Sequence, residues 1–280
     1  MEITDELRTI EATLGDGATL GVCAVSNDGK WAEHNADTVF PTASIIKAVI
    51  VAELWARIAE GNLSATDTVT LAQADTVAGS GVLASLAPGH TFTLAELAGL
   101  AISVSDNTAS NAVLRAVGGV EVVNARMRES WGMPNTVIHR PIQFHLEPGD
   151  PPHTATGTPR DMCHFMNAIA AKTLHSPAVS ESIAALLATC DDTAMLPRYL
   201  DVNAFAADLG TAPPPLAVYH KPGAVTGVRG DAGFVRRGDA PGHVAMAVYT
   251  KGVSDTRWTV ANAGCEAVAR VAQRLVRGLL

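Results

Sequence analysis

The chain has 280 residues, of which 48% are hydrophobic and 17% charged, so it can bury a core of its own. Its 28 acidic and 20 basic side chains give a net charge of −8, which argues against a general nucleic-acid binder and against docking on an anionic membrane. The longest apolar runs are too short to span a bilayer. We therefore expect a soluble globular protein, with neither nucleic acid nor membrane as a partner.

The N-terminal segment is acidic where a secretory signal would be basic, and no long apolar stretch follows it. This pattern predicts a cytoplasmic protein, or a secreted or periplasmic one whose signal has been removed. Apolar residues at helical spacing predict a helix over residues 4–14. Residues 20–25 are typical of a strand, and the turn signal at 27–30 leads to a second strand near Trp31.

The middle of the chain, from about residue 41 to 197, is mostly helical in pattern, with loops expected at Gly61, at 88–89 and over 134–159. After residue 215 the pattern again favours strands. The expected elements there are listed in chain order: strands over 216–220, 231–236 and 244–249, a turn at 238–242, and a closing helix over about 256–280.

Both ends of the chain are thus rich in strands, and consecutive hairpins favour an antiparallel sheet. We expect one α/β (α+β) domain built from residues 1–40 and 198–280, and a helical domain over 41–197. A cleft between two such domains is a natural place for an active site. Four scattered cysteines without C-x-x-C spacing favour free thiols over a metal site: Cys23, Cys163, Cys190 and Cys265.

A serine and a lysine near the start of the helical region could form a nucleophile and its base. Pro41 and Thr42 favour a helix start, which places Ser44 in a first turn whose unpaired N–H groups favour a developing oxyanion. Lys47 follows on the same face and can accept a proton if burial and a second cation lower its pKa. By itself, S-x-x-K describes an ordinary helix equally well.

Two further motifs follow in chain order. Residues 105–111 read Ser-Asp-Asn-Thr-Ala-Ser-Asn, which alone is typical of a helix N-cap. Residues 221–224 read Lys-Pro-Gly-Ala at the expected end of a strand, which alone describes a solvated charge and a turn. Neither motif indicates a function until the order of all three is considered.

S-x-x-K, S-D-N and K-x-G in this order are the motifs of class A β-lactamases and penicillin-binding proteins. Residues 40–47 resemble that family's nucleophile helix, residues 105–111 its S-D-N stretch, and residues 221–233 its catalytic strand and the strand beside it. The resemblance runs from about residue 5 to residue 275. It implies a five-stranded antiparallel sheet flanked by N- and C-terminal helices, together with an all-helical lobe.

The resemblance also implies a role for each matching residue. Ser44 would be the acylated nucleophile with Lys47 as its base. Ser105 would pass the proton to the leaving group, and Lys221 would hold its hydroxyl. The backbone N–H groups of Ser44 and Ala224 would form the oxyanion hole. Asp106 would brace its loop, and the substrate-binding residues would be Asn107, Gly223, Thr226 and Arg229.

Two departures from the family pattern change the expected chemistry. Pro222 stands where the family has threonine or serine and lacks a hydroxyl and an N–H, so carboxylate recognition would rest on Arg229 and Thr226. The Glu-x-x-Leu-Asn loop motif is absent between 133 and 159, and Arg140 falls near the expected glutamate. Because that glutamate activates the deacylating water, we expect intact acylation and slow or altered deacylation.

Three loop residues are candidates for a substitute base, although each also fits an ordinary loop residue: His145, Glu147 and His153. The spacing of the loop histidines matches no common metal-ligand pattern, so we expect neither a metal nor another cofactor. The leading hypothesis is a serine acyl hydrolase that acts on a small-molecule amide, β-lactam or ester. The alternatives are an esterase or acyltransferase of small-molecule biosynthesis and a protein that binds β-lactams without turnover. The sequence leaves the oligomeric state open.

Overall fold

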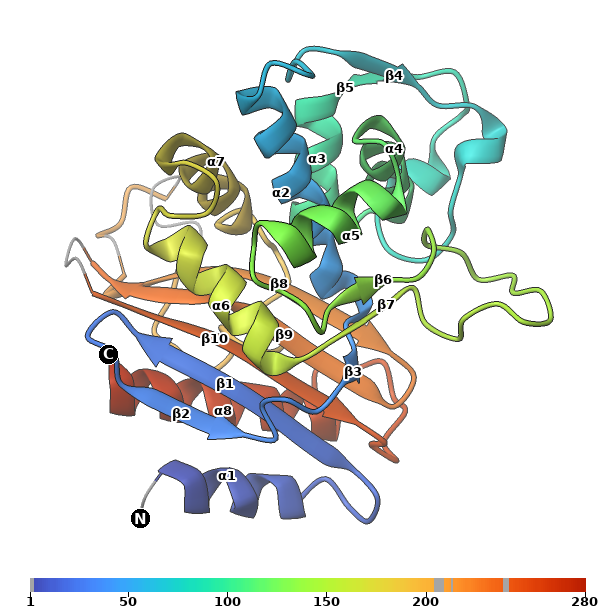
Figure 1. The fold of residues 1–280 in the computed structure, drawn as a ribbon. Helices are drawn as coiled ribbons and strands as arrows, with labels where there is room; N and C mark the ends of the chain where they lie inside the picture. The colour runs from blue at the N-terminus through green and yellow to red at the C-terminus, as the bar shows by residue number, and fades with distance from the viewer. Residues whose placement is uncertain (1–2, 204–208, 213, 239–241) are drawn as a thin grey trace.

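The protein, described by a computed structural model over residues 3–203, 209–212, 214–238 and 242–280, is built around a five-stranded antiparallel sheet (Figure 1). The strand order is β2-β1-β10-β9-β8, so the first two strands of the chain join the last three. This confirms the expected fold class. The strands are β1 (Thr19–Ser26), β2 (Trp31–His34), β8 (Leu216–Val225), β9 (Val228–Arg237) and β10 (His243–Lys251).

Helices cover both faces of this sheet. Helices α1 (Ile3–Ala12) and α8 (Ala263–Leu279) lie against one face, and α6 (Pro159–Ala170) crosses the other (Figure 1). The sequence of β10 explains why both faces are covered, because its successive side chains point to opposite faces of the sheet and join different cores. Val244, Met246 and Val248 join the core under α8, whereas Ala245, Ala247 and Tyr249 join the core shared with α6.

The helical lobe is arranged around α2 (Ile46–Ala59), which is apolar on most of its circumference and therefore buried. Four helices pack against it: α3 (Leu94–Ser103), α4 (Asn107–Ala116), α5 (Val120–Glu129) and α7 (Pro177–Leu187). Short elements complete the lobe: β3 (Phe40–Pro41), η1 (Ala43–Ile45), β4 (Thr68–Thr70), η2 (Gln73–Asp75), η3 (Leu83–Ser85), β5 (Thr91–Thr93), β6 (Val137–Ile138) and β7 (Ala155–Gly157).

Two expected boundaries were wrong for identifiable reasons. The closing helix begins at Ala263 instead of near residue 256, because the Asn262 side chain caps it by accepting two backbone N–H groups of its first turn. Strand β8 continues to Val225, so the motif at 221–224 lies inside the strand and not at its end. Pro222 is tolerated there because β8 is an edge strand of the sheet.

Other expectations have mixed outcomes. The stretch from residue 60 to 93, expected to be mostly helical, holds the β4–β5 pair and two 3₁₀ turns. Of the turn expected at 238–242, residues 239–241 lie outside the described residues. Helix α6 comes from the range 41–197 and packs on the sheet, while the domain boundaries themselves stay a prediction. All four cysteines are buried free thiols. Among the helices described, none is both long and apolar enough to cross a membrane.

Candidate active site

Ser44 lies in the 3₁₀ turn η1, directly ahead of α2, and not within the first turn of an α-helix as expected. The turn is strained, because Ala43 has φ +46°, which costs roughly 1–2 kcal/mol for a residue with a side chain. Gly223 of β8 packs closely against this turn. A Cβ at position 223 would lie 2.7 Å from the Thr42 carbonyl and 2.9 Å from the Ser44 nitrogen. Glycine therefore lets the catalytic-strand backbone approach the Ser44 N–H.

Lys47 is completely buried beneath this turn. Its Nζ donates to the Ser105 carbonyl at 2.5 Å, to Ser105 Oγ at 3.1 Å and to Asn107 Oδ1 at 2.7 Å. Burial, and secondarily the charge of Lys221, holds the pKa of Lys47 well below its usual 10.5, although the Asp106 carboxylate opposes this. The amine is thus linked to two predicted site residues, and within the described part of the chain it makes no hydrogen bond to Ser44.

The S-D-N motif forms the wall beside Lys47. Ser105 has φ +55°, a second strained residue at the site. Asp106 caps α4 through the Ala109 N–H, and its other oxygen accepts the N–H groups of residues 82 and 83. Asn107 donates to the Ala78 carbonyl at 2.8 Å. The expected bracing role of Asp106 is visible in these contacts, which fix the segment 78–83 against the motif.

Lys221 is also completely buried, and its Nζ donates to the Pro222 carbonyl at 3.2 Å. Burial lowers the pKa of Lys221. Immediately before it, His220 Nδ1 lies 2.9 Å from the Asp231 carboxylate. Burial alone would lower the pKa of His220, but the charge and hydrogen bond of Asp231, together with Cys190, outweigh burial and raise that pKa to about 10. Sequence reasoning missed this pair, because it depends on the register of β8 with β9.

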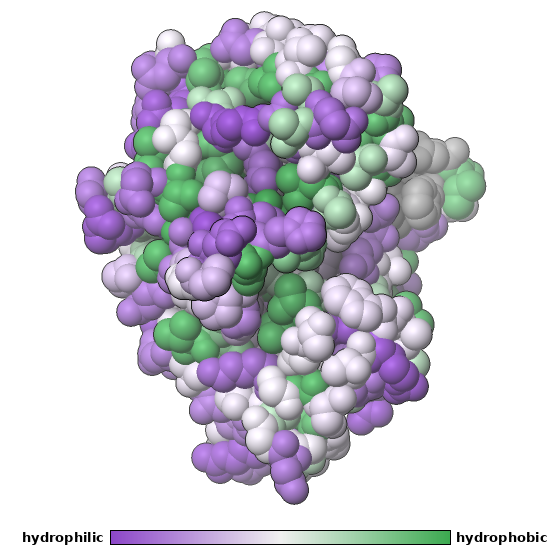
Figure 2. Space-filling view, turned by 90° about the vertical axis from the view of Figure 1, so that its right-hand side faces the viewer, coloured by the Kyte–Doolittle hydropathy of each residue, from purple (hydrophilic) through white to green (hydrophobic). Residues whose placement is uncertain are grey.

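A cavity of about 750 Å³ opens over Ser44. The space-filling view shows the molecule hollowed beside the loop that projects from it (Figure 2). Among the predicted site residues, the cavity brings together Ser44, Asn107, Ala224, Thr226 and His153. Of the three candidate bases, only His153 lines the cavity, whereas His145 and Glu147 lie exposed on the loop and outside the lining.

Arg229 is 3% exposed and does not line this cavity in the structure. Its guanidinium donates to the carbonyls of Val225 and Val228 at 2.8 Å and of Arg257 at 2.9 Å. It also stacks on the Trp258 ring, 4.8 Å from its centroid. The guanidinium therefore supports the cavity wall from behind, and a direct contact with a substrate carboxylate stays a prediction.

The loop over residues 139–154 forms the remaining wall, and Arg140 lines the cavity where a glutamate was expected. Sequence reasoning also missed Phe144, Leu146 and Trp258, which line the same cavity. An apolar residue in a loop belongs to no periodic pattern, so only its exposure in the folded chain draws attention to it.

Comparison with known proteins agrees with this geometry. The Beta-lactamase enzyme family matches residues 2–279. β-Lactamase PSE-4 of Pseudomonas aeruginosa is 30% identical over 129 residues, which are 46% of this chain and 44% of that protein, so the match spans less than half of this curated relative. A β-lactamase structure from Sphaerobacter thermophilus has a TM-score of 0.85 at 28% identity, covering 99% of this chain and 97% of that one.

The structure of a PBP-A mutant, solved as its acyl-enzyme complex with penicillin G, is also similar. It has a TM-score of 0.82 at 25% identity, and the match covers 98% of this chain and 95% of that one. The resemblance inferred from the three motifs is thereby confirmed at the level of the whole chain. The chain belongs to the Beta-lactamase enzyme family and has the class A β-lactamase fold.

Proposed function

We propose that the protein is a serine acyl hydrolase that forms an acyl-enzyme at Ser44, acting on an amide, β-lactam or ester. The observation that carries this proposal is the buried Lys47 amine, whose lowered pKa leaves it able to accept a proton beneath the Ser44 turn. A buried lysine whose pKa is strongly depressed beside a cavity is a candidate for a catalytic base. The relatives named above support the same chemistry.

In the proposed acylation, Ser44 Oγ attacks the substrate carbonyl and its proton passes to the neutral Lys47 amine. The oxyanion that forms is stabilised by the backbone N–H groups of Ser44 and Ala224. When the tetrahedral intermediate collapses, the bond to the leaving nitrogen or oxygen breaks. Ser105 then donates its proton to that atom and is reprotonated from Lys47, 3.1 Å away. Lys221 adds positive potential to this side of the site.

Deacylation is the step for which this chain is poorly equipped. Among the described residues, the cavity lining contains no aspartate or glutamate to activate a water molecule. Hydrolysis would therefore depend on His153, or the acyl group would persist until another acceptor removes it. This favours a long-lived acyl-enzyme, and it keeps acyl transfer to an amine or alcohol as the second candidate function.

The proposal is tested by intact mass after incubation with penicillin G and, separately, with the activated ester p-nitrophenyl acetate. We expect a single adduct on the wild-type protein and on Ser85→Ala, an exposed serine outside the site, and none on Ser44→Ala. No adduct from either reagent on the wild type, or an equal adduct on Ser44→Ala, would refute it. Faster loss of the adduct when amines or alcohols are added would identify a transferase.

A further inference from the structure

Three large apolar side chains around the Ser44 cavity are conspicuously exposed. Trp258 is 69% exposed, Phe144 63% and Leu146 44%, and all three line this one cavity. Exposed apolar side chains that gather around a concavity mark a surface that something else covers. Arg140 is the one arginine, and no lysine, aspartate or glutamate joins it in the described lining of the cavity, so the lining itself offers little charge to a substrate.

The loop that carries Phe144 and Leu146 is held in place by its own polar groups. Arg140 donates to carbonyls on both limbs of the loop, at Gln143 and Pro151. Asp150 Oδ2 accepts the Gln143 side chain and the backbone N–H of residue 147. Asn111 of α4 exchanges two hydrogen bonds with the backbone of Ile142. The apolar side chains are therefore presented by a braced loop, which lowers the entropic cost of binding a substrate against them.

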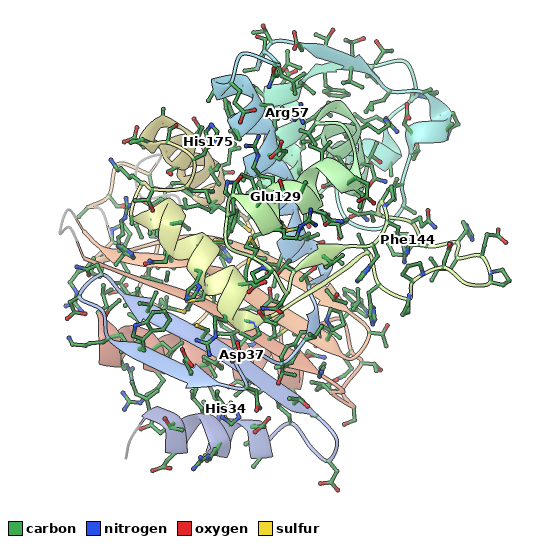
Figure 3. All side chains as sticks on the ribbon, in the orientation of Figure 1. His34, Asp37, Arg57, Glu129, Phe144 and His175 are labelled. Atoms are coloured by element: carbon green, nitrogen blue, oxygen red, sulfur yellow. The ribbon has the colours of Figure 1, made fainter. Side chains whose placement is uncertain are left out.

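Phe144 is directed toward the helical lobe. Figure 3 shows it on the part of the loop nearest to α4. A Cβ on Gly79 would lie 3.1 Å from the Phe144 ring and 2.9 Å from Asn107 Nδ2. Gly79, with φ +94°, therefore lets the ring settle beside the amide of Asn107. The Phe144 ring and Ser44 therefore line the same cavity.

Trp258, which also lines the cavity, is fixed from behind. Its ring stacks on the buried Arg229 guanidinium, which also binds the carbonyl of residue 257. The Asn262 side chain donates to the same carbonyl. A cation behind one face of an indole leaves the other available for a flat apolar group. Two aromatic side chains on braced segments thus line the cavity over Ser44.

We propose that this cavity selects substrates whose acyl group is bulky and aromatic, held by Phe144, Leu146 and Trp258. The inference rests on the proposed acylation of Ser44, which it makes more specific. The Ser44-bound carbonyl lies in the polar part of the site, and the aromatic part of the acyl group is removed from water between these side chains. Small acyl groups are transferred to Ser44 by the same step, but they bury no aromatic surface against these side chains.

The test compares p-nitrophenyl phenylacetate with p-nitrophenyl acetate, by the burst of p-nitrophenolate that accompanies acylation. We expect kcat/KM for acylation to favour the phenylacetyl ester by about 30-fold in the wild type, within the range that apolar pockets achieve. Trp258→Ala and Phe144→Ala should each reduce this preference by about fivefold or more. Trp31→Ala is the control, because Trp31 is 48% exposed on β2 and lies outside the cavity.

An equal rate for the two esters, or a preference unchanged by both substitutions, would overturn the inference while leaving the acylation of Ser44 intact. Equilibrium binding of both esters to Ser44→Ala separates the two proposals. If the wild type forms no adduct but Ser44→Ala binds the phenylacetyl ester about tenfold more tightly, and Trp258→Ala removes this difference, the aromatic site stands without the proposed function. Equal binding of both esters by Ser44→Ala would refute the aromatic site.

Discussion

Two walls of the same cavity are built on opposite principles. One wall is lined by Asn107 and has Lys47 and Ser105 behind it. It is largely buried, and its polar atoms bind one another across two separate motifs. The wall formed by the loop over residues 139–154 is mostly exposed, and its polar atoms bind the loop's own backbone or brace it on α4. The first wall is prepared to move a proton, whereas the second is prepared to present side chains.

Under the proposed function, this difference means that the deacylation step can change while the acylation step is kept. Acylation needs groups whose pKa values are set by burial, and such groups tolerate little change because each is held by the others. Deacylation needs only one well-placed base on the opposite wall. A loop that holds its shape through backbone contacts can lose that base without disturbing the buried wall.

The largest effect is expected from removing the amine of the buried wall. Lys47→Met should lower the rate of acylation by about 10³-fold, since it removes the general base. In the wild type, acylation should rise with pH as Lys47 loses its proton and should level off well below pH 10.5, because its pKa is lowered. Burst kinetics from pH 5 to 10 measures both effects, with Lys172→Met on the surface as the control. A rate that still climbs through pH 10 would show that Lys47 is not the base.

The second effect is on the free energy of unfolding, and it tests how firmly Asp106 holds the buried wall. Asp106→Ala should cost about 2–4 kcal/mol of unfolding free energy, because it removes a helix cap and leaves three N–H groups without their carboxylate. Asp67→Ala, which removes an exposed carboxylate bound to a single backbone N–H, should cost less than about 1 kcal/mol. Urea unfolding of both variants measures the difference. Equal losses would mean that Asp106 does not brace the buried wall.

The buried wall was largely predictable from sequence, and the exposed wall was not. S-x-x-K, S-D-N and K-x-G are chemical signatures whose order alone predicted the residues around Ser44. The strand pattern over 244–249 and the turn before Trp31 likewise predicted strands of the sheet. The 3₁₀ turn at Ser44 was missed, because the positive φ of Ala43 is imposed by tertiary packing and not by its residue type.

The loop could be predicted only by what it lacks. The missing glutamate was readable in the sequence, but the positions of the candidate bases depend on how the loop closes on itself. Arg140 closes the loop by donating to carbonyls on both of its limbs. The residues that it joins are not spaced by any helix or strand period. The partnership of Trp258 with Arg229 has the same origin, since residues 29 apart in loop and strand meet only in the folded chain.

The smallest expected effect tests whether the exposed wall retains any part in hydrolysis. Burial, together with the charges of His139 and Arg140, lowers the pKa of His153 below its usual 6.5, so at pH 7 its imidazole is mainly neutral and able to accept a proton from water. His153→Gln should lengthen the lifetime of the acyl-enzyme by about 10- to 50-fold and leave acylation unchanged. His145→Gln on the exposed part of the loop should alter neither step.

The same group predicts a pH dependence. Because a base acts only when unprotonated, deacylation in the wild type should slow as the pH falls below 6.5, and His153→Gln should lose this dependence. The measurement is the decay of the acyl-enzyme adduct, followed by intact mass from pH 5 to 8. If His153→Gln and His145→Gln give the same adduct lifetime and that lifetime does not change with pH, the loop wall only binds the acyl group.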